Sequence, residues 1–280
     1  MDVLADRVLA LGPKPAATGP YRHFKLTRDG DGIAWLLFDR EGASANTLSA
    51  DVMEEFDRVL DELENQRPSG LVIRSAKKSG FIAGADVNEF RGASDPNIVE
   101  AAIGRAHAVI DRLEALRVPS VAVIHGFCLG GGLEVALACQ SRIAIDNARF
   151  GFPEVMLGLH PGLGGTVRLP RLIGQSRALD LILTGRPVAA DEALQMGLAN
   201  RVVPQADLLA QAEALALQIA GFPQACMRND RRSFYEQWGQ SEDEALAREF
   251  QLGLETLQSG ETLSGASRFT GGTGRHGNFE

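Results

Sequence analysis

The segment HGFCLGGGLEVALAC (residues 125–139) places three consecutive glycines in front of an apolar run that contains one carboxylate, Glu134. Glycines 130–132 can adopt backbone angles that other residues resist, and they let a ligand approach bare main chain. The first N–H groups of a helix have no intrahelical partner, and the helix dipole is positive there. The segment therefore predicts a turn and a helix whose start suits a phosphate or an oxyanion. An ordinary helix start would also carry an acid such as Glu134.

Two other stretches have a similar character. In FIAGADVNEF (81–90), small residues lie between an apolar strand and a polar turn, so the main chain at Gly84–Ala85 can offer an exposed N–H. An ordinary left-handed turn at Gly84 explains the same pattern. In GFPEVML (151–157), Glu154 follows Pro153 and precedes an apolar run, which is also typical of a plain helix start.

Composition and charge limit the function. The chain has 280 residues and a net charge of −8, whereas nucleic-acid binding needs a basic surface. Its three cysteines (Cys128, Cys139 and Cys226) form no C-x-x-C pair, so we expect neither a disulfide framework nor a metal site. No stretch approaches the roughly 18 apolar residues of a membrane span, and the N-terminus lacks the features of a signal peptide. We therefore expect a cytoplasmic protein without membrane association.

Hydrophobic periodicity predicts an α/β core followed by a helical C-terminal region. Strands are expected on both sides of a turn within residues 23–38 and at residues 70–75, 119–126, 142–145 and 201–204. Helices are expected near residues 49–64, 98–116, 165–173, 175–184, 189–196, 205–220, 223–238 and 241–258. The crossovers are long enough for parallel strand pairing.

Several conspicuous residues are assigned no catalytic role. Residues 272–277 match G-x-G-x-x-G, but no strand precedes them, so we reject a dinucleotide site. His125 and His160 lack partners for a catalytic triad and are interpreted as structural residues. Arg168 and Arg171 are expected to bind carboxylates or helix ends rather than a substrate.

Four stretches together resemble the crotonase superfamily, the enoyl-CoA hydratase/isomerase family. In chain order they are IAGAD (82–86), HGFCLGGGLEVALAC (125–139), FGFPEVMLGLHPGLGGTVRLPRLIG (150–174) and LTGRPVAADEALQMGLANRVVP (183–204). The resemblance runs from about residue 23 to the C-terminal helices. Residues 150–174 are especially similar to the hydratase part of multifunctional β-oxidation enzymes, without the dehydrogenase domain that follows there, which implies a stand-alone hydratase-like unit.

The resemblance implies an α/β fold of repeated β-β-α units wound into a spiral. It divides the chain into an N-terminal arm (1–20), a spiral core (21–204) and a C-terminal helical region (205–280). In this family the C-terminal helices cover the site and mediate trimer contacts. A homotrimer, or a hexamer of paired trimers, is therefore expected.

The resemblance also implies a site that adds water across the 2,3 double bond of a 2-enoyl-CoA. Backbone N–H groups of Ala85 and Gly131 would hold the thioester oxygen, and Glu134 and Glu154 would share one water molecule. Further substrate-binding positions are expected at Ala83, Gly84, Asp86 and Gly130. No metal and no cofactor are expected, because coenzyme A is part of the substrate. A buried carboxylate has a raised pKa, which suits proton exchange near neutrality.

Alternatives remain open at this stage. A Δ3–Δ2 enoyl-CoA isomerase can work with the acid at the Glu154 position alone. A non-catalytic acyl-CoA-binding or RNA-binding relative is a third possibility, against which the acid pair and the acidic charge argue. Lys77 and Lys78 either face coenzyme A phosphates or form a solvated turn. Phe250 and Phe269 either line an acyl tunnel or belong to ordinary core.

Overall fold

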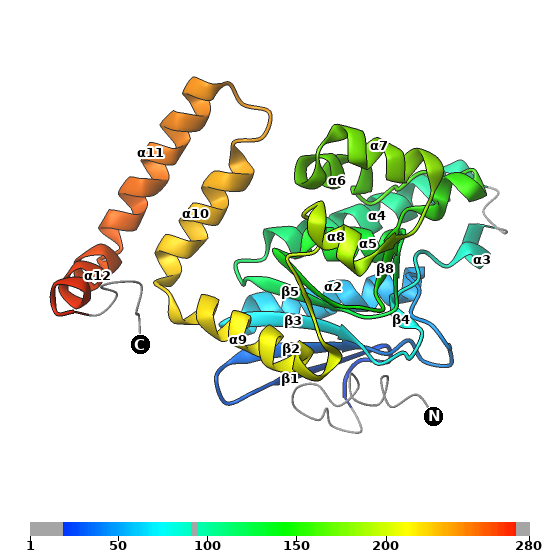
Figure 1. The fold of residues 1–280 in the computed structure, drawn as a ribbon, viewed down its shortest axis with the longest axis horizontal. Helices are drawn as coiled ribbons and strands as arrows, with labels where there is room; N and C mark the ends of the chain where they lie inside the picture. The colour runs from blue at the N-terminus through cyan, green and yellow to red at the C-terminus, as the bar shows by residue number, and fades with distance from the viewer. Residues whose placement is uncertain (1–18, 91–94, 273–280) are drawn as a thin grey trace. The chain divides into compact units, whose positions relative to one another are not determined.

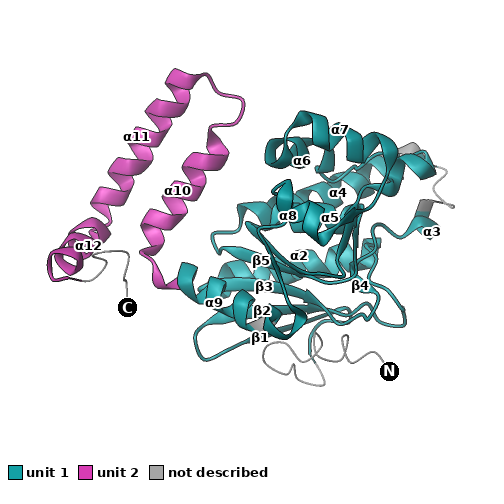
Figure 2. Cartoon of the chain, viewed as in Figure 1, with its two compact units in different colours: residues 1–219 teal, residues 220–280 magenta. Residues whose placement is uncertain are grey.

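The computed structural model describes residues 19–90 and 95–272. They form two compact units, one ending at Ile219 and the other beginning at Ala220 (Figures 1 and 2). Nearly all of the predicted arm over residues 1–20, and most of the rejected glycine motif at 272–277, lies outside the described residues. The predicted division at residues 204 and 205 stays a prediction.

A six-stranded sheet forms the base of the first unit. Its strands, in spatial order, are β1 (Phe24–Arg28), β2 (Ile33–Phe38), β3 (Gly70–Ser75), β5 (Ser120–Ile124), β7 (Ser141–Ile145) and β10 (Arg201–Val203). β1 and β2 form the predicted antiparallel hairpin, and the strands from β2 to β10 are parallel. β2, β3 and β5 are buried along their whole length, as parallel strands covered on both faces should be.

A second, smaller sheet contains β4 (Gly80–Ile82), β6 (Phe127–Leu129), β8 (Arg149–Gly151) and β9 (Val188–Ala189). β4, β6 and β8 are parallel, and β9 is antiparallel to β8. Along the chain, β3, β5 and β7 of the first sheet lead into β4, β6 and β8 of the second, and helical segments follow each pair. This arrangement confirms the predicted spiral of β-β-α units.

The helices agree closely with the predicted ranges. In the first unit they are α2 (Ala50–Gln66), α3 (Val87–Phe90), α4 (Pro96–Ala115), α5 (Gly131–Ala138), η1 (Pro153–Leu157), α6 (Gly165–Ile173), α7 (Gln175–Thr184), α8 (Ala190–Gln195), η2 (Gln205–Asp207) and α9 (Leu208–Gly221), whose last two residues belong to the second unit. The second unit contains α10 (Gln224–Glu236), α11 (Glu242–Gln258) and α12 (Glu261–Thr270). Neither α3 nor α12 was predicted. Among the described residues, no helix is long and apolar enough to cross a membrane.

The second unit contains several exposed aromatic side chains. Phe250 is 63% exposed and Phe269 is 55% exposed. The expectation that they could be ordinary core residues is therefore wrong for the single chain.

α11 begins with a capping box between Ser241 and Glu244, which explains why its start was predictable from the sequence.

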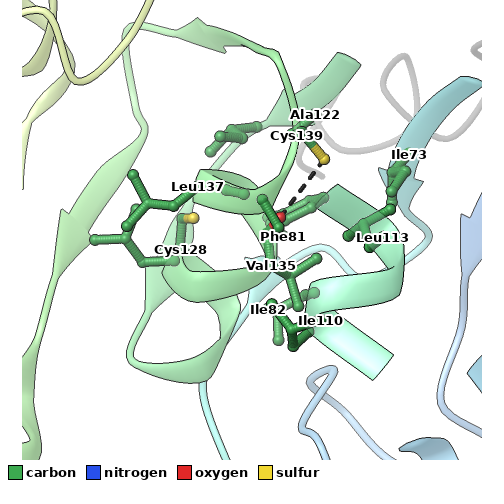
Figure 3. Packing of buried hydrophobic residues seen from close by; sticks show 14 of the residues in the cluster. Ile73, Phe81, Ile82, Ile110, Leu113, Ala122, Cys128, Val135, Leu137 and Cys139 are labelled. Atoms are coloured by element: carbon green, nitrogen blue, oxygen red, sulfur yellow. Dashed lines mark hydrogen bonds between the residues drawn. The ribbon is translucent and has the colours of Figure 1, made fainter. Parts of the chain in front are cut away.

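The core of the first unit surrounds α5, whose residues are all buried. Figure 3 shows Val135 and Leu137 of this helix with core residues from neighbouring elements. The thiols of Cys128 and Cys139 are completely buried, and burial raises both thiol pKa values, that of Cys139 to about 11. Both cysteines thus behave as small apolar residues, as predicted.

We expect Gly132→Ala to destabilise the fold, because an added Cβ would overlap the carbonyl oxygen of Ile82 in β4. Overpacking of this kind typically costs about 1–3 kcal/mol of unfolding free energy. The matched control is Gly104→Ala in α4, where nothing lies within 4 Å of an added Cβ; it should gain about 0.5–1 kcal/mol. Urea denaturation measures both values. Equal unfolding free energies for the two variants would contradict the predicted overlap.

Candidate active site

The candidate residues lie just after three neighbouring strands of the second sheet. Residues 83–86 follow β4, the glycines at 130–132 follow β6 and begin α5, and Glu154 follows β8 by three residues. Because β4, β6 and β8 are parallel, their carboxyl ends lie on one edge of the sheet. Segments that are about 45 and 25 residues apart in sequence therefore meet at one place, as at the strand ends of other parallel sheets.

The N–H group of Ala85 is available to a ligand. Leu48 forms an isolated parallel bridge with Ala85, in which the Leu48 N–H donates to Gly84 O and the Asp86 N–H donates to Leu48 O, both at 2.9 Å. A parallel bridge of this kind leaves the central residue's own N–H pointing to the opposite side. Within the described part of the chain, the Ala85 N–H has no hydrogen-bond acceptor.

Residues around Asn46 hold this segment in place. The Ala83 N–H donates to Asn46 O at 2.8 Å, and the buried Asn46 amide donates to Phe81 O at 3.2 Å. Arg40 pairs with Asp86 at 2.7 Å and holds the pKa of that carboxyl below its usual range. The Asp86 side chain is thus engaged by Arg40. No sequence pattern marks Asn46 and Arg40, because their partners lie about 35 to 46 residues away.

The second backbone donor lies at the start of α5. Gly130 has φ 51° and ψ −128°, a conformation that favours glycine, and its N–H donates to Gly151 O at 2.9 Å. The N–H of Gly131 has no acceptor among the described residues, as expected for the first residue of a helix. A Cβ placed on Gly131 would lie 3.7 Å from the Ala85 nitrogen. The two N–H groups are therefore neighbours, with no side chain of residue 131 between them.

Glu134 is almost completely buried, with 2% of its surface exposed. Its Oε1 accepts hydrogen bonds from the N–H groups of Leu163, at 2.6 Å, and Gly165, at 2.7 Å. Burial raises the pKa of Glu134 to about 7; the charge of Glu154 adds to this rise, while the two N–H donors oppose it. Leu163 and Gly165 were not predicted from the sequence, because backbone donors have no side-chain signature.

Glu154 lies in the short 3-10 helix η1 rather than in an ordinary α-helix. Its carboxyl group lies over Gly130, since a Cβ on Gly130 would come within 2.6 Å of Glu154 Oε1. Its Oε2 is buried and has no hydrogen-bond partner among the described residues. Burial raises the pKa of Glu154, and its own N–H opposes the rise. The two carboxyl groups and the two free N–H groups thus surround one glycine turn.

Other candidate residues have structural partners. Lys77 pairs with Asp39 at 2.7 Å and donates to Arg40 O, so its ammonium group is engaged within the fold. Nε2 of the buried His125 lies 2.7 Å from Lys77 O, and burial lowers the pKa of this imidazole. Arg168 binds the Glu114 carboxylate, as predicted. The described residues contain no group of His, Cys, Asp and Glu side chains able to hold a metal ion.

Comparison with known proteins identifies the family of the chain. The enoyl-CoA hydratase/isomerase family model matches residues 28–272. The fatty acid oxidation complex subunit alpha of Shewanella sp. (strain ANA-3) is 48% identical over 197 residues, which is 69% of this chain and 28% of that protein. The chain thus spans less than a third of the length of this relative.

Solved structures extend the similarity over most of the chain. An enoyl-CoA hydratase from Bacillus anthracis is 32% identical, with a TM-score of 0.82, and the match covers 89% of this chain and 96% of that one. An enoyl-CoA hydratase from Mycobacterium smegmatis is 26% identical, with a TM-score of 0.83, and the match covers 93% of this chain and 99% of that one. The chain belongs to the enoyl-CoA hydratase/isomerase family.

Proposed function

We propose that this protein is an enoyl-CoA hydratase, which adds water to a 2-enoyl-CoA and forms a 3-hydroxyacyl-CoA. The observation that carries the proposal is the pair of carboxyl groups, the buried Glu134 and the half-buried Glu154, beside two backbone N–H groups that have no acceptor among the described residues. Adding water to a double bond conjugated to a thioester requires a base, an acid and stabilisation of an enolate. The glycine turn offers all three within one site.

The proposed reaction proceeds through an enolate. Glu134 takes a proton from water as the water oxygen bonds to Cβ, and the double-bond electrons move to the thioester oxygen. The N–H groups of Ala85 and Gly131 donate to this oxygen as its negative charge develops. The enolate then collapses as Cα takes a proton from the Glu154 carboxylic acid. Proton exchange with solvent returns Glu134 and Glu154 to their starting states.

The hydrogen bonds of the two acids support this division of roles. Two N–H groups donate to Glu134, which favours its ionised form and suits it to act as a base. Glu154 has a buried oxygen with no partner in the described part of the chain, an environment that favours the neutral, proton-bearing form. The substrate brings its own coenzyme A, so the proposed reaction needs no separate cofactor.

A Δ3–Δ2 enoyl-CoA isomerase is the second candidate. It needs a single acid that moves a proton between two carbons, and Glu154, whose Oε2 accepts no hydrogen bond from any described residue, suits this task. We also propose that copies of the chain associate as a trimer or hexamer. The exposed Phe234, Trp238, Phe250 and Phe269 of the second unit support association, because such side chains are commonly covered in oligomers.

We expect Glu134→Gln and Glu154→Gln each to lower kcat for crotonyl-CoA hydration by about 10²–10⁴-fold, the usual contribution of an acid or base. The loss of enoyl-thioester ultraviolet absorbance measures the rate. Glu100→Gln, on the exposed surface of α4, is the matched control and should keep wild-type turnover. Turnover of a 3-enoyl-CoA without hydration of crotonyl-CoA would favour the isomerase instead.

The pH dependence of hydration should show an acid limb near the pKa of Glu134, about 7. Since the ionised carboxylate activates water, kcat/KM should rise about tenfold per pH unit below this value, and it should fall again at higher pH, where Glu154, the proposed acid, loses its proton. Steady-state rates from pH 5.5 to 8 measure this limb. A flat profile over this range, with wild-type activity intact, would exclude Glu134 as the base.

Burial of Glu134 should also make stability depend on pH. The pKa of Glu134 is about 7 in the folded protein against an ordinary value of 4.5, so the folded state holds the proton more tightly. This contribution to stability is fully present below pH 4.5 and is lost as the pH rises to 7. Glu134→Gln avoids the loss and should exceed wild-type stability at pH 8 by up to about 3 kcal/mol. Urea unfolding of both proteins at pH 5 and pH 8 tests this. A difference in unfolding free energy between Glu134→Gln and wild type that is the same at both pH values would contradict it.

A further inference from the structure

Arg168 occupies an unusual place for a cation. It lies in the first turn of α6, where the helix dipole favours acids, and only 12% of its side chain is exposed. Its guanidinium makes two hydrogen bonds to Glu114, at 3.0 Å and 2.9 Å, and one to Asp111, at 2.7 Å. Both acids belong to α4. Arg168 thus fastens the start of α6 to another helix.

The same guanidinium also holds the turn that supports Glu134. Arg168 Nη1 donates to Leu163 O at 2.9 Å, while the N–H of the same residue, Leu163, donates to Glu134. Between the two donors of this turn, Gly164 has φ 102°, and a Cβ there would overlap Arg168 Nη1. The turn at residues 163–165 is therefore held by Arg168 at one carbonyl and delivers two N–H groups to Glu134.

We infer that Arg168 is a positioning residue for Glu134: it fastens the 163–165 turn to α4 and so keeps both N–H donors on the carboxylate that activates water. This inference rests on the proposed hydration. Arg168 does not contact Glu134 directly in any hydrogen bond between described residues, so it acts through the turn.

The charges around Glu134 also support a positioning role for Arg168. The charged groups that act on Glu134 are Glu154 from η1, which raises its pKa, and Arg168 from α6, which lowers it. Loss of Arg168 removes the cation and loosens the two N–H donors. Both changes disfavour the ionised form of Glu134.

The test compares Arg168→Ala with Arg112→Ala. Arg112 is an equally engaged arginine of α4, with ion pairs to Asp57, Asp61 and Glu64 of α2, and it is not bonded to the 163–165 turn. For Arg168→Ala we expect kcat for crotonyl-CoA hydration to fall about tenfold or more with KM within about twofold, since small displacements of a catalytic group cost rate. The acid limb of kcat/KM should also move to higher pH.

Arg112→Ala should lose stability, but its kcat should not fall and its acid limb should not move. Arg168→Lys keeps the charge without the planar fork and should recover part of the lost kcat. If Arg168→Ala does not fold, Arg168→Lys carries the test, and wild-type kcat in that variant overturns the inference.

The remaining outcomes separate this inference from the proposed function. An active wild type with an unmoved kcat and pH profile in Arg168→Ala overturns the positioning role alone. Equal effects of Arg112→Ala and Arg168→Ala on kcat and the acid limb would overturn it too, because they would reflect general loosening. A wild type that hydrates no 2-enoyl-CoA would overturn the proposed function and this inference together.

Discussion

The burial of one carboxylate, Glu134, is the constraint that organises this site. A carboxylate removed from water needs hydrogen bonds to replace its hydration. Here the N–H groups of Leu163 and Gly165 supply them, so the chain must bring residues 163–165 back to the start of α5. That requirement connects the β6–α5 unit with α6, about 30 residues later in the chain. The cost of burial is only partly offset, which leaves a raised pKa suited to proton exchange near neutrality.

The three consecutive glycines of this turn satisfy three separate steric requirements. Gly130 lies beneath the Glu154 carboxyl group, Gly131 lies beside the Ala85 nitrogen, and Gly132 packs against Ile82. A side chain at any of the three would contact a different neighbour, in η1, in the loop that follows β4, or in β4 itself. The glycine run is therefore set by the close approach of main-chain segments from β4, β6 and β8, which is also what leaves two backbone donors uncovered.

The extent to which the sequence predicted the structure differs between these features. Long elements such as α2 and α11 were predictable because apolar periodicity or a capping box marks them. β6 and β8 span three residues each, too few to show a period, and their pairing depends on distant strands. Glu134 and Glu154 became candidates through resemblance, since each also fits an ordinary helix start. The donors that support Glu134 are backbone groups, and no residue type marks them in the sequence.

The charge balance around the site follows from the same constraint. Three cations lie near the glycine turn or the segments that hold it, and each is paired with a carboxylate. The pairs are Arg40 with Asp86, Lys77 with Asp39 and Arg168 with Glu114. An unneutralised cation beside the two glutamates would lower their pKa values and remove the proton that Glu154 is proposed to donate. Paired cations can hold loops in place with a weaker effect of this kind: Arg168 lowers the pKa of Glu134, but its influence is smaller than that of burial. Neutralised arginines and backbone dipoles, rather than free charges, therefore let one site contain both a base and an acid.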